Sequence, residues 1–270
     1  MGWDISYHPI SESQIQEWYF NVLEDQNLID KLSKEYKIED FYKEKYSNAI
    51  NYGLEIKKSL EEGDTAVFEK NHGFFIAVVQ GFFQQYFYTR GSALSFSESG
   101  LLEKYFKKWN DILLDKQQLK SEFYNRISEN YSSGVYIPKD KVVELLKDYE
   151  TDSDLKEELD SLFSYSRIDV FLKALNFAKN NDLGVLEATE VVEPFPFDLN
   201  NSSSYSNLFN CDIDGPLLYQ QAAMGQIAEI EKNENLEEGK ISSKIEYKVV
   251  NIEPKKEEEK KGFWKKLFGK

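Results

Sequence analysis

Cysteine and histidine are almost missing from this chain of 270 residues, which holds one Cys (Cys211) and two His (His8 and His72). A single cysteine cannot form an internal disulfide, and the first residues carry no export signal, so we expect a reducing cytoplasm. Zinc sites usually draw on several Cys and His, and neither His has a second His at the i+4 spacing of a helical zinc motif. We therefore expect neither a metal nor a cofactor.

Proline and glycine are also scarce, at six and fourteen residues, which favours helices with short connections over a sandwich of strands and turns. The glycines form neither a Gly-x-Gly-x-x-Gly loop nor a Lys-containing phosphate loop. The longest apolar run, Phe74 to Tyr88, would extend about 22 Å as a helix, against a hydrocarbon core of roughly 30 Å. We expect this run to be a buried helix rather than a membrane span.

Basic residues are outnumbered, with 33 Lys and Arg against 48 Asp and Glu and a net charge of −15. Nucleic-acid binding draws its affinity from basic groups that release counterions, so we expect no nucleic-acid partner. The charge is uneven, because residues 255–270 carry +4 and residues 1–254 carry −19. A hydrophobic fraction of 41% with 15% aromatics nevertheless supplies a folded core.

The spacing of apolar residues predicts a single α+β domain over residues 1–254, predominantly α-helical, with a small, mostly antiparallel sheet. Alternation from Trp3 to His8 indicates a half-buried strand, and further strands are expected near 185–192 and 241–252. Ser11 and Gln14 form a capping box before the first helix. Helices are also expected over 38–60, 74–88, 99–113, 116–131, 139–150, 153–164, 167–180 and 216–232.

Acidic residues gather between residues 144 and 160, where eight acids accompany two Lys. One interpretation is an exposed face that is simply solvated. The other is a binding surface for a basic protein partner, because such a field speeds encounter and fixes orientation. The apolar anchors would then be Tyr149, Leu155, Leu159 and Leu162. The candidate partner-binding residues are Glu144, Asp148, Tyr149, Glu150, Asp152, Asp154, Glu157 and Glu158.

A charged spacer of simple sequence, Lys255 to Lys261, precedes an amphipathic tail. In a helix, the apolar side chains of this tail would share one face, which is typical of a short segment that folds on contact. Three destinations stay open: an anionic membrane surface, a groove on a partner, or the body of the chain itself. The tail residues are Phe263, Trp264, Lys265, Lys266, Leu267 and Phe268.

Residues 210–215, Asn-Cys-Asp-Ile-Asp-Gly, match the first half of a calcium-binding loop, but Gln221 replaces the bidentate Glu at the twelfth position. We therefore expect an ordinary helix start there. An enzyme stays an alternative, namely a hydrolase that uses dispersed carboxylates with His8 or His72. No pattern singles out a catalytic residue.

In its acidity, helical content, abundance of Tyr and Phe and lack of catalytic motifs, the chain resembles the cytoplasmic immunity proteins that bacteria pair with antibacterial toxins. The resemblance concerns overall character and transfers no site residues. It implies a non-enzymatic protein that neutralises a toxin, often one with a basic cleft, through an acidic, aromatic-rich surface. A peripheral membrane adaptor that uses the tail, at the inner face of the membrane, is the third interpretation.

Overall fold

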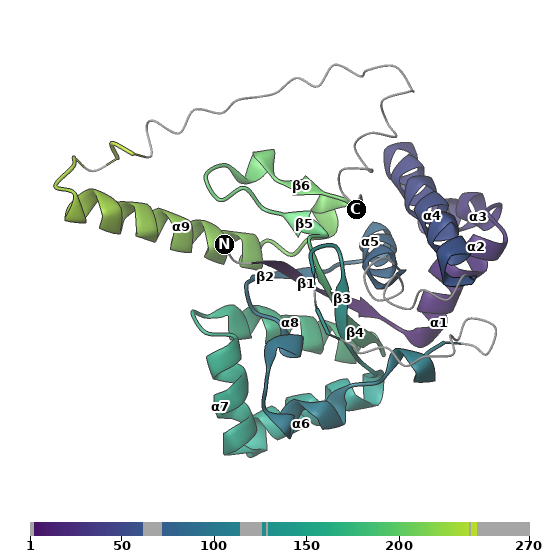
Figure 1. The fold of residues 1–270 in the computed structure, drawn as a ribbon, viewed down its shortest axis with the longest axis horizontal. Helices are drawn as coiled ribbons and strands as arrows, with labels where there is room; N and C mark the ends of the chain where they lie inside the picture. The colour runs from purple at the N-terminus through teal and green to yellow at the C-terminus, as the bar shows by residue number, and fades with distance from the viewer. Residues whose placement is uncertain (1–2, 62–71, 114–125, 128, 238, 242–270) are drawn as a thin grey trace. The chain divides into compact units, whose positions relative to one another are not determined.

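The computed structural model describes residues 3–61, 72–113, 126–127, 129–237 and 239–241. The chain divides into two compact units, residues 1–224 and 225–270. In the described part of the first unit, an antiparallel sheet of four strands has the order β2-β1-β4-β3 (Figure 1). The predicted class, a mostly helical α+β protein with a small antiparallel sheet, is confirmed.

The described elements have the following bounds. The strands are β1 (Asp4–Ile10), β2 (Phe87–Arg90), β3 (Ser133–Ile137), β4 (Gly184–Thr189), β5 (Val192–Glu193) and β6 (Ser203–Ser204). The α-helices are α1 (Glu12–Ile15), α2 (Asn21–Glu24), α3 (Leu28–Glu35), α4 (Asp40–Glu61), α5 (Gly73–Phe83), α6 (Lys139–Thr151), α7 (Ser153–Leu162), α8 (Arg167–Asn180) and α9 (Asp214–Asn233).

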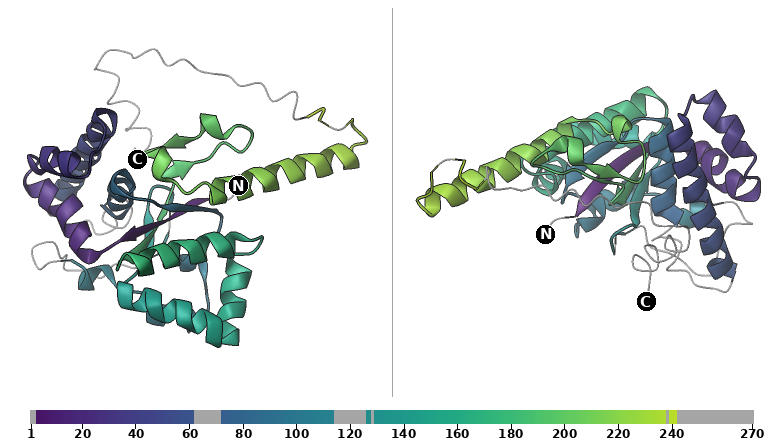
Figure 2. Two further views of the ribbon diagram at one scale, coloured as in Figure 1. Left: turned by 180° about the vertical axis from the view of Figure 1, so that it is seen from behind. Right: turned by 90° about the horizontal axis from the view of Figure 1, so that it is seen from above.

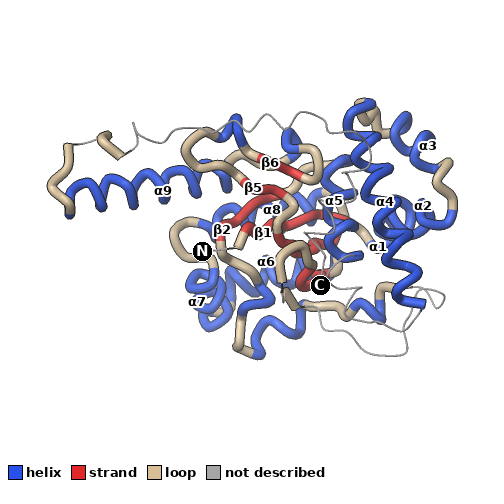
Figure 3. Tube along the Cα trace, turned by 45° about the horizontal axis from the view of Figure 1, so that its top comes forward, coloured by secondary structure: helices blue, strands red, loops and turns tan. Residues whose placement is uncertain are grey.

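Helices cover both faces of the main sheet. Helices α4 and α5 lie on one face, and α6 and α8 lie on the other (Figures 1 and 2). Strand β1 is therefore buried on both sides, with Ile5 and Tyr7 facing one core and Ser6 and His8 the other. The strand was predicted correctly. The prediction that it is half-buried was wrong, because helices cover both faces of the sheet. Figure 3 shows the strands at the centre, with helices around them.

The long apolar run forms a shorter helix than predicted. Ten of the eleven residues of α5 are buried, as expected for a core helix. The helix ends at Phe83, because Gln84 takes an extended conformation and its side-chain amide donates to the carbonyl of Pro9 in β1. The rest of the run then enters the sheet as β2, where Tyr7 pairs with Phe87.

The first helix begins with the predicted capping box. Ser11 Oγ accepts a hydrogen bond from the Gln14 amide (3.1 Å), and Gln14 Oε1 accepts one from the Ser11 amide (2.9 Å). A π-helical turn over Gln16–Phe20 then joins α1 to α2. This turn buries Trp18, Tyr19 and Phe20 in succession, which a regular helix would spread around its circumference.

The prediction of an α-helix over 99–113 was wrong, because this segment forms two short 3₁₀ helices, Gly100–Tyr105 and Trp109–Asp111. Between them the chain extends along the edge of the sheet, where the Lys107 amide donates to the Tyr136 carbonyl of β3 (2.9 Å). The helix predicted over 116–131 falls mostly outside the described residues. Its described end, 126–127 and 129–131, is not helical.

Beyond the main sheet, β5 and β6 form a second small sheet, and α9 begins close to the predicted position. The predicted strand at 241–252, the domain boundary at 254 and the tail Phe263–Phe268 fall almost wholly beyond residue 241, outside the described residues, and stay predictions. In the part of the chain that the structure describes, no helix is both long and apolar enough to cross a membrane.

Candidate functional site

Helices α6 and α7 carry seven of the eight predicted binding residues and meet at the eighth, Asp152. The carboxylate of Asp152 caps α7, since Oδ1 accepts hydrogen bonds from the amides of Asp154 (3.0 Å) and Leu155 (3.2 Å). Of the predicted apolar anchors, Tyr149 is half-buried, and the leucines are not available on this surface. Leu155 and Leu159 are buried in the core, and Leu162 is half-buried against it. The helical spacing that makes α7 amphipathic points these leucines inward.

Several of the predicted residues are already engaged within the chain. The pairs are Glu144 with Lys141 (2.6 Å), Asp148 with Lys104 (2.8 Å) and Tyr105 (2.7 Å), Tyr149 with Asp160 (2.7 Å), and Glu158 with Ser97 (2.5 Å). The Lys104 ammonium holds the pKa of Asp148 below its usual range. Asp148 and Glu158 connect α6 and α7 to neighbouring segments, whereas the Tyr149 bond joins the two helices and the Glu144 pair lies within α6.

The remaining acids form what we call the acidic surface: Glu150, Asp152, Asp154 and Glu157, all exposed. Among the described residues, the carboxylates of Glu150, Asp154 and Glu157 have no hydrogen-bond or ion-pair partner. Exposed apolar groups accompany them on the same elements, with Val143 on α6 and Tyr165, 87% exposed, just after α7. Tyr165 could not be singled out from the sequence, because it lies in a short connection without periodicity.

The two histidines are core residues. His8 stacks on Tyr86 with ring centroids 5.0 Å apart, and its Nδ1 donates to Gln80 Oε1 (2.7 Å) while its Nε2 accepts from Ser6 Oγ (2.8 Å). His72 Nδ1 lies 2.5 Å from the hydroxyl of Tyr19. Burial lowers the pKa of His8 to about 4 and that of His72 to about 3, so both rings are neutral at pH 7. Neither ring is accessible to a substrate.

The loop that resembles half of a calcium site is held by a lysine. The Lys173 ammonium lies 2.6 Å from the carboxylates of both Asp212 and Asp214.

Burial raises the pKa of Cys211 to about 12, so its thiol stays protonated and is a poor nucleophile at neutral pH. Across the described ranges, no group of three or more His, Cys, Asp and Glu side chains could hold a metal ion.

A cluster of carboxylates lies where β1, β2 and the end of β4 meet. Asp4 pairs with Arg90 and accepts a hydrogen bond from the Tyr88 hydroxyl (2.6 Å). The Glu190 amide donates to the Asp4 carbonyl (2.7 Å), and Glu190 has a left-handed backbone with φ of 58°. Burial and the charge of Asp4 raise the pKa of Glu190 to about 7, and they also raise the pKa of Glu193. The sequence offered no signal for this cluster, because carboxylates are abundant throughout the chain.

This cluster predicts a pH-dependent stability. Because the folded-state pKa of Glu190 lies above its ordinary 4.5, the stability from the neutral carboxyl is complete below pH 4.5 and is lost as the pH rises through about 7. We expect Glu190→Gln to raise the free energy of unfolding by about 1–2 kcal/mol at pH 8, allowing for solvent screening, and to leave it unchanged at pH 4. Urea unfolding at both pH values measures this, with the exposed Glu103→Gln as control. Equal gains at pH 4 and pH 8 would contradict it.

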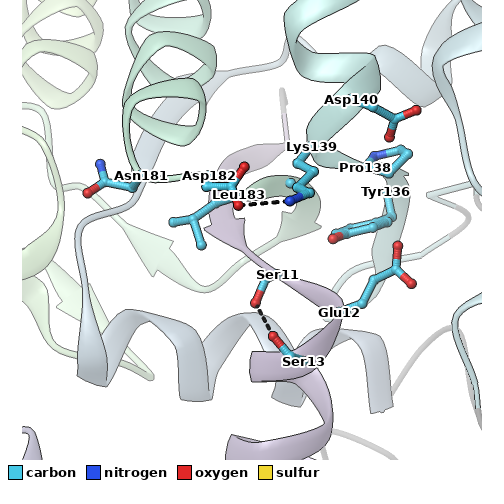
Figure 4. Close-up of a pocket in the computed structure, with 11 residues that line it drawn as sticks. Ser11, Glu12, Ser13, Tyr136, Pro138, Lys139, Asp140, Asn181, Asp182 and Leu183 are labelled. Atoms are coloured by element: carbon cyan, nitrogen blue, oxygen red, sulfur yellow. Dashed lines mark hydrogen bonds and ion pairs between the residues drawn. The ribbon is translucent and has the colours of Figure 1, made fainter.

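A hollow of about 450 Å³ opens where β1 leads into α1 and β3 leads into α6 (Figure 4). Several of its polar lining groups are already bonded within the chain. Lys139 pairs with Asp182 (2.8 Å), Ser11 bonds to Ser13 (2.9 Å), and Glu12 pairs with Lys107 (2.7 Å). The lining contains neither His nor Cys.

The acidic surface thus groups several exposed carboxylates that the described residues leave unpaired. The histidines are enclosed in the core, and Glu12, Lys139 and Asp182 of the hollow are paired. No known protein family, curated protein or solved structure matches this chain.

Proposed function

We propose that this protein is a non-enzymatic binding protein that recognises a basic protein partner through the acidic surface of α6 and α7. The observation that carries the proposal is the separation of the acids into two groups. Asp148 and Glu158 are bonded within the fold, whereas Glu150, Asp154 and Glu157 are exposed and unpaired among the described residues. Carboxylates of the second kind keep their charge available, and they act over about 8 Å at physiological ionic strength.

The partner class that fits this surface best is a toxin domain with a basic cleft, and the protein would then act as an immunity protein in the cytoplasm. The net charge of −19 over residues 1–254 supports this, because a strongly acidic body accelerates encounter with a basic partner. Attachment to the inner face of the membrane through the tail Phe263–Phe268 would be a second mode of interaction. The buried, neutral His8 and His72 lend no support to a hydrolase that uses them.

A charge reversal on the acidic surface tests the proposal. Affinity capture from the source cell is expected to yield one stoichiometric basic partner. With that partner purified, Glu150→Lys/Asp154→Lys/Glu157→Lys should lower the association rate constant by about tenfold or more at low salt, and the difference should vanish at high salt. Stopped-flow or surface-plasmon measurements across a salt series provide the rates.

The matched control is Glu17→Lys/Glu35→Lys/Glu39→Lys, which changes the net charge by the same amount on exposed residues near the start of the chain. This control should retain most of the association rate. Two outcomes would count against the proposal: capture of no stoichiometric partner, or equal losses in the two triple variants, which would show that only total charge matters.

A further inference from the structure

A second hollow, of about 300 Å³, lies in the first unit between the start of α8 and the first turns of α9. Its lining combines the apolar side chains of Val170, Leu217 and Leu218 with the carboxyl groups of Asp169 and Asp214. Leu217 is partly exposed, so the apolar wall is open to solvent. A pocket of this composition suits a side chain that has an aliphatic stem and a cationic end.

The charge around this hollow is negative. Asp169 is exposed, and its carboxylate has no partner among the described residues. Asp214 shares the single ammonium of Lys173 with Asp212, both at 2.6 Å. Two carboxylates thus share one cation and a third has none, which leaves an excess of negative charge for a cation from outside.

An exposed aromatic ring stands next to this hollow in sequence. Tyr165 and Ser166, which lines the hollow, both have left-handed backbones, with φ of 58° and 62°. Arg167 holds this strained turn, because its guanidinium donates to the carbonyls of Ser164 (2.7 Å) and Arg90. The amide of Ile168 also donates to the Phe163 carbonyl (3.0 Å). The Tyr165 ring is exposed to solvent, and the Arg167 guanidinium lies 5.4 Å from its centroid.

We infer that this hollow, with Tyr165 beside it, receives an arginine side chain of the protein partner. The methylene stem would lie on Leu217 and Leu218, and the guanidinium would bond to Asp169 and Asp214 in charge-assisted hydrogen bonds. The Tyr165 ring supplies the kind of aromatic anchor that dominates binding energy at protein interfaces. The inference rests on the proposed function for the nature of the partner, but it uses residues outside the acidic surface.

A titration with a small probe tests the hollow without any protein partner. The ¹⁵N-labelled full chain is titrated with N-acetyl-L-arginine methylamide, and separately with the neutral isostere N-acetyl-L-citrulline methylamide. We expect saturable shifts of the Ser166, Asp169 and Leu217 amides, with the citrulline compound at least fivefold weaker. Asp169→Asn should weaken arginine binding by a similar factor, whereas Asp154→Asn on the acidic surface should not.

The absence of saturable shifts at these amides would overturn the inference, as would equal binding of the two compounds or equal losses in Asp169→Asn and Asp154→Asn.

With the captured partner, Tyr165→Ala should weaken binding at least tenfold while its thermal unfolding matches that of the parent. The two proposals can fail separately. Arginine binding in the hollow, together with no effect of charge reversal on α6 and α7, would remove the proposed acidic surface and leave the hollow standing.

Discussion

The Glu187→Ala variant is expected to lose about 3–5 kcal/mol of unfolding free energy. Glu187 lies within β4, is 0% exposed, and faces the core beneath α8. Its carboxylate accepts hydrogen bonds from the Tyr7 hydroxyl (3.1 Å) and from the amides of Leu94 and Ser95 (3.3 Å). Burial raises the pKa of Glu187, and these donors act in the opposite direction. Truncation would leave the buried Ser95 amide without this acceptor and the Leu94 amide with only its bond to the Tyr7 hydroxyl (3.3 Å), and it would open a cavity beside them.

Urea unfolding measures the loss, with circular dichroism in the absence of urea to establish that the variant is folded. Glu187→Gln keeps the volume and one acceptor oxygen, so it should lose less, about 1–2 kcal/mol. The exposed Glu103→Ala should change stability by no more than about 0.5 kcal/mol. A loss below about 1 kcal/mol in Glu187→Ala would show that the loop around Leu94 does not depend on this carboxylate.

The helices of this fold could be predicted where local spacing decides them. Helices α6, α7 and α8 lie at the predicted positions, because each has an apolar face of helical period. Strands β2 and β3 could not be predicted, because they are short and buried on both faces, so they show no alternation. Their pairing depends on partners far away in sequence, as where Phe87 of β2 lies opposite Tyr7.

The acidic segment could be located from the sequence. Its exposed, unpaired acids could not be distinguished from the acids that are bonded within the fold. Whether an acid is free depends on distant residues: Asp148 is bonded to Lys104, and Glu158 to Ser97, from segments that helix spacing says nothing about. The hollow between α8 and α9 could not be predicted for the same reason. Asp169 and Asp214 come from two helices that the fold, and not any motif, brings together.

The Gly215→Ala variant is expected to lose about 3 kcal/mol or more of unfolding free energy. A Cβ at Gly215 would lie 1.9 Å from the carbonyl oxygen of Tyr88 in β2. Because that oxygen belongs to the backbone of the sheet, no side-chain rotation can relieve the contact. The start of α9 would have to move away, and the hydrogen bond from the Asp212 amide to the Tyr86 carbonyl (2.8 Å) would be strained.

Gly225→Ala on the same helix is the matched control. A Cβ at Gly225 would meet no atom within 4 Å, so alanine should stabilise the helix by about 0.5–1 kcal/mol. Thermal and urea unfolding of the two variants give the comparison, and similar stabilities would contradict the close approach of α9 to β2. Because the start of α9 also places Asp214 and Leu217 in the hollow, Gly215→Ala should abolish the arginine-induced shifts. Gly225→Ala should preserve these shifts. The comparison shows whether the hollow depends on the position of α9 or on its helical propensity.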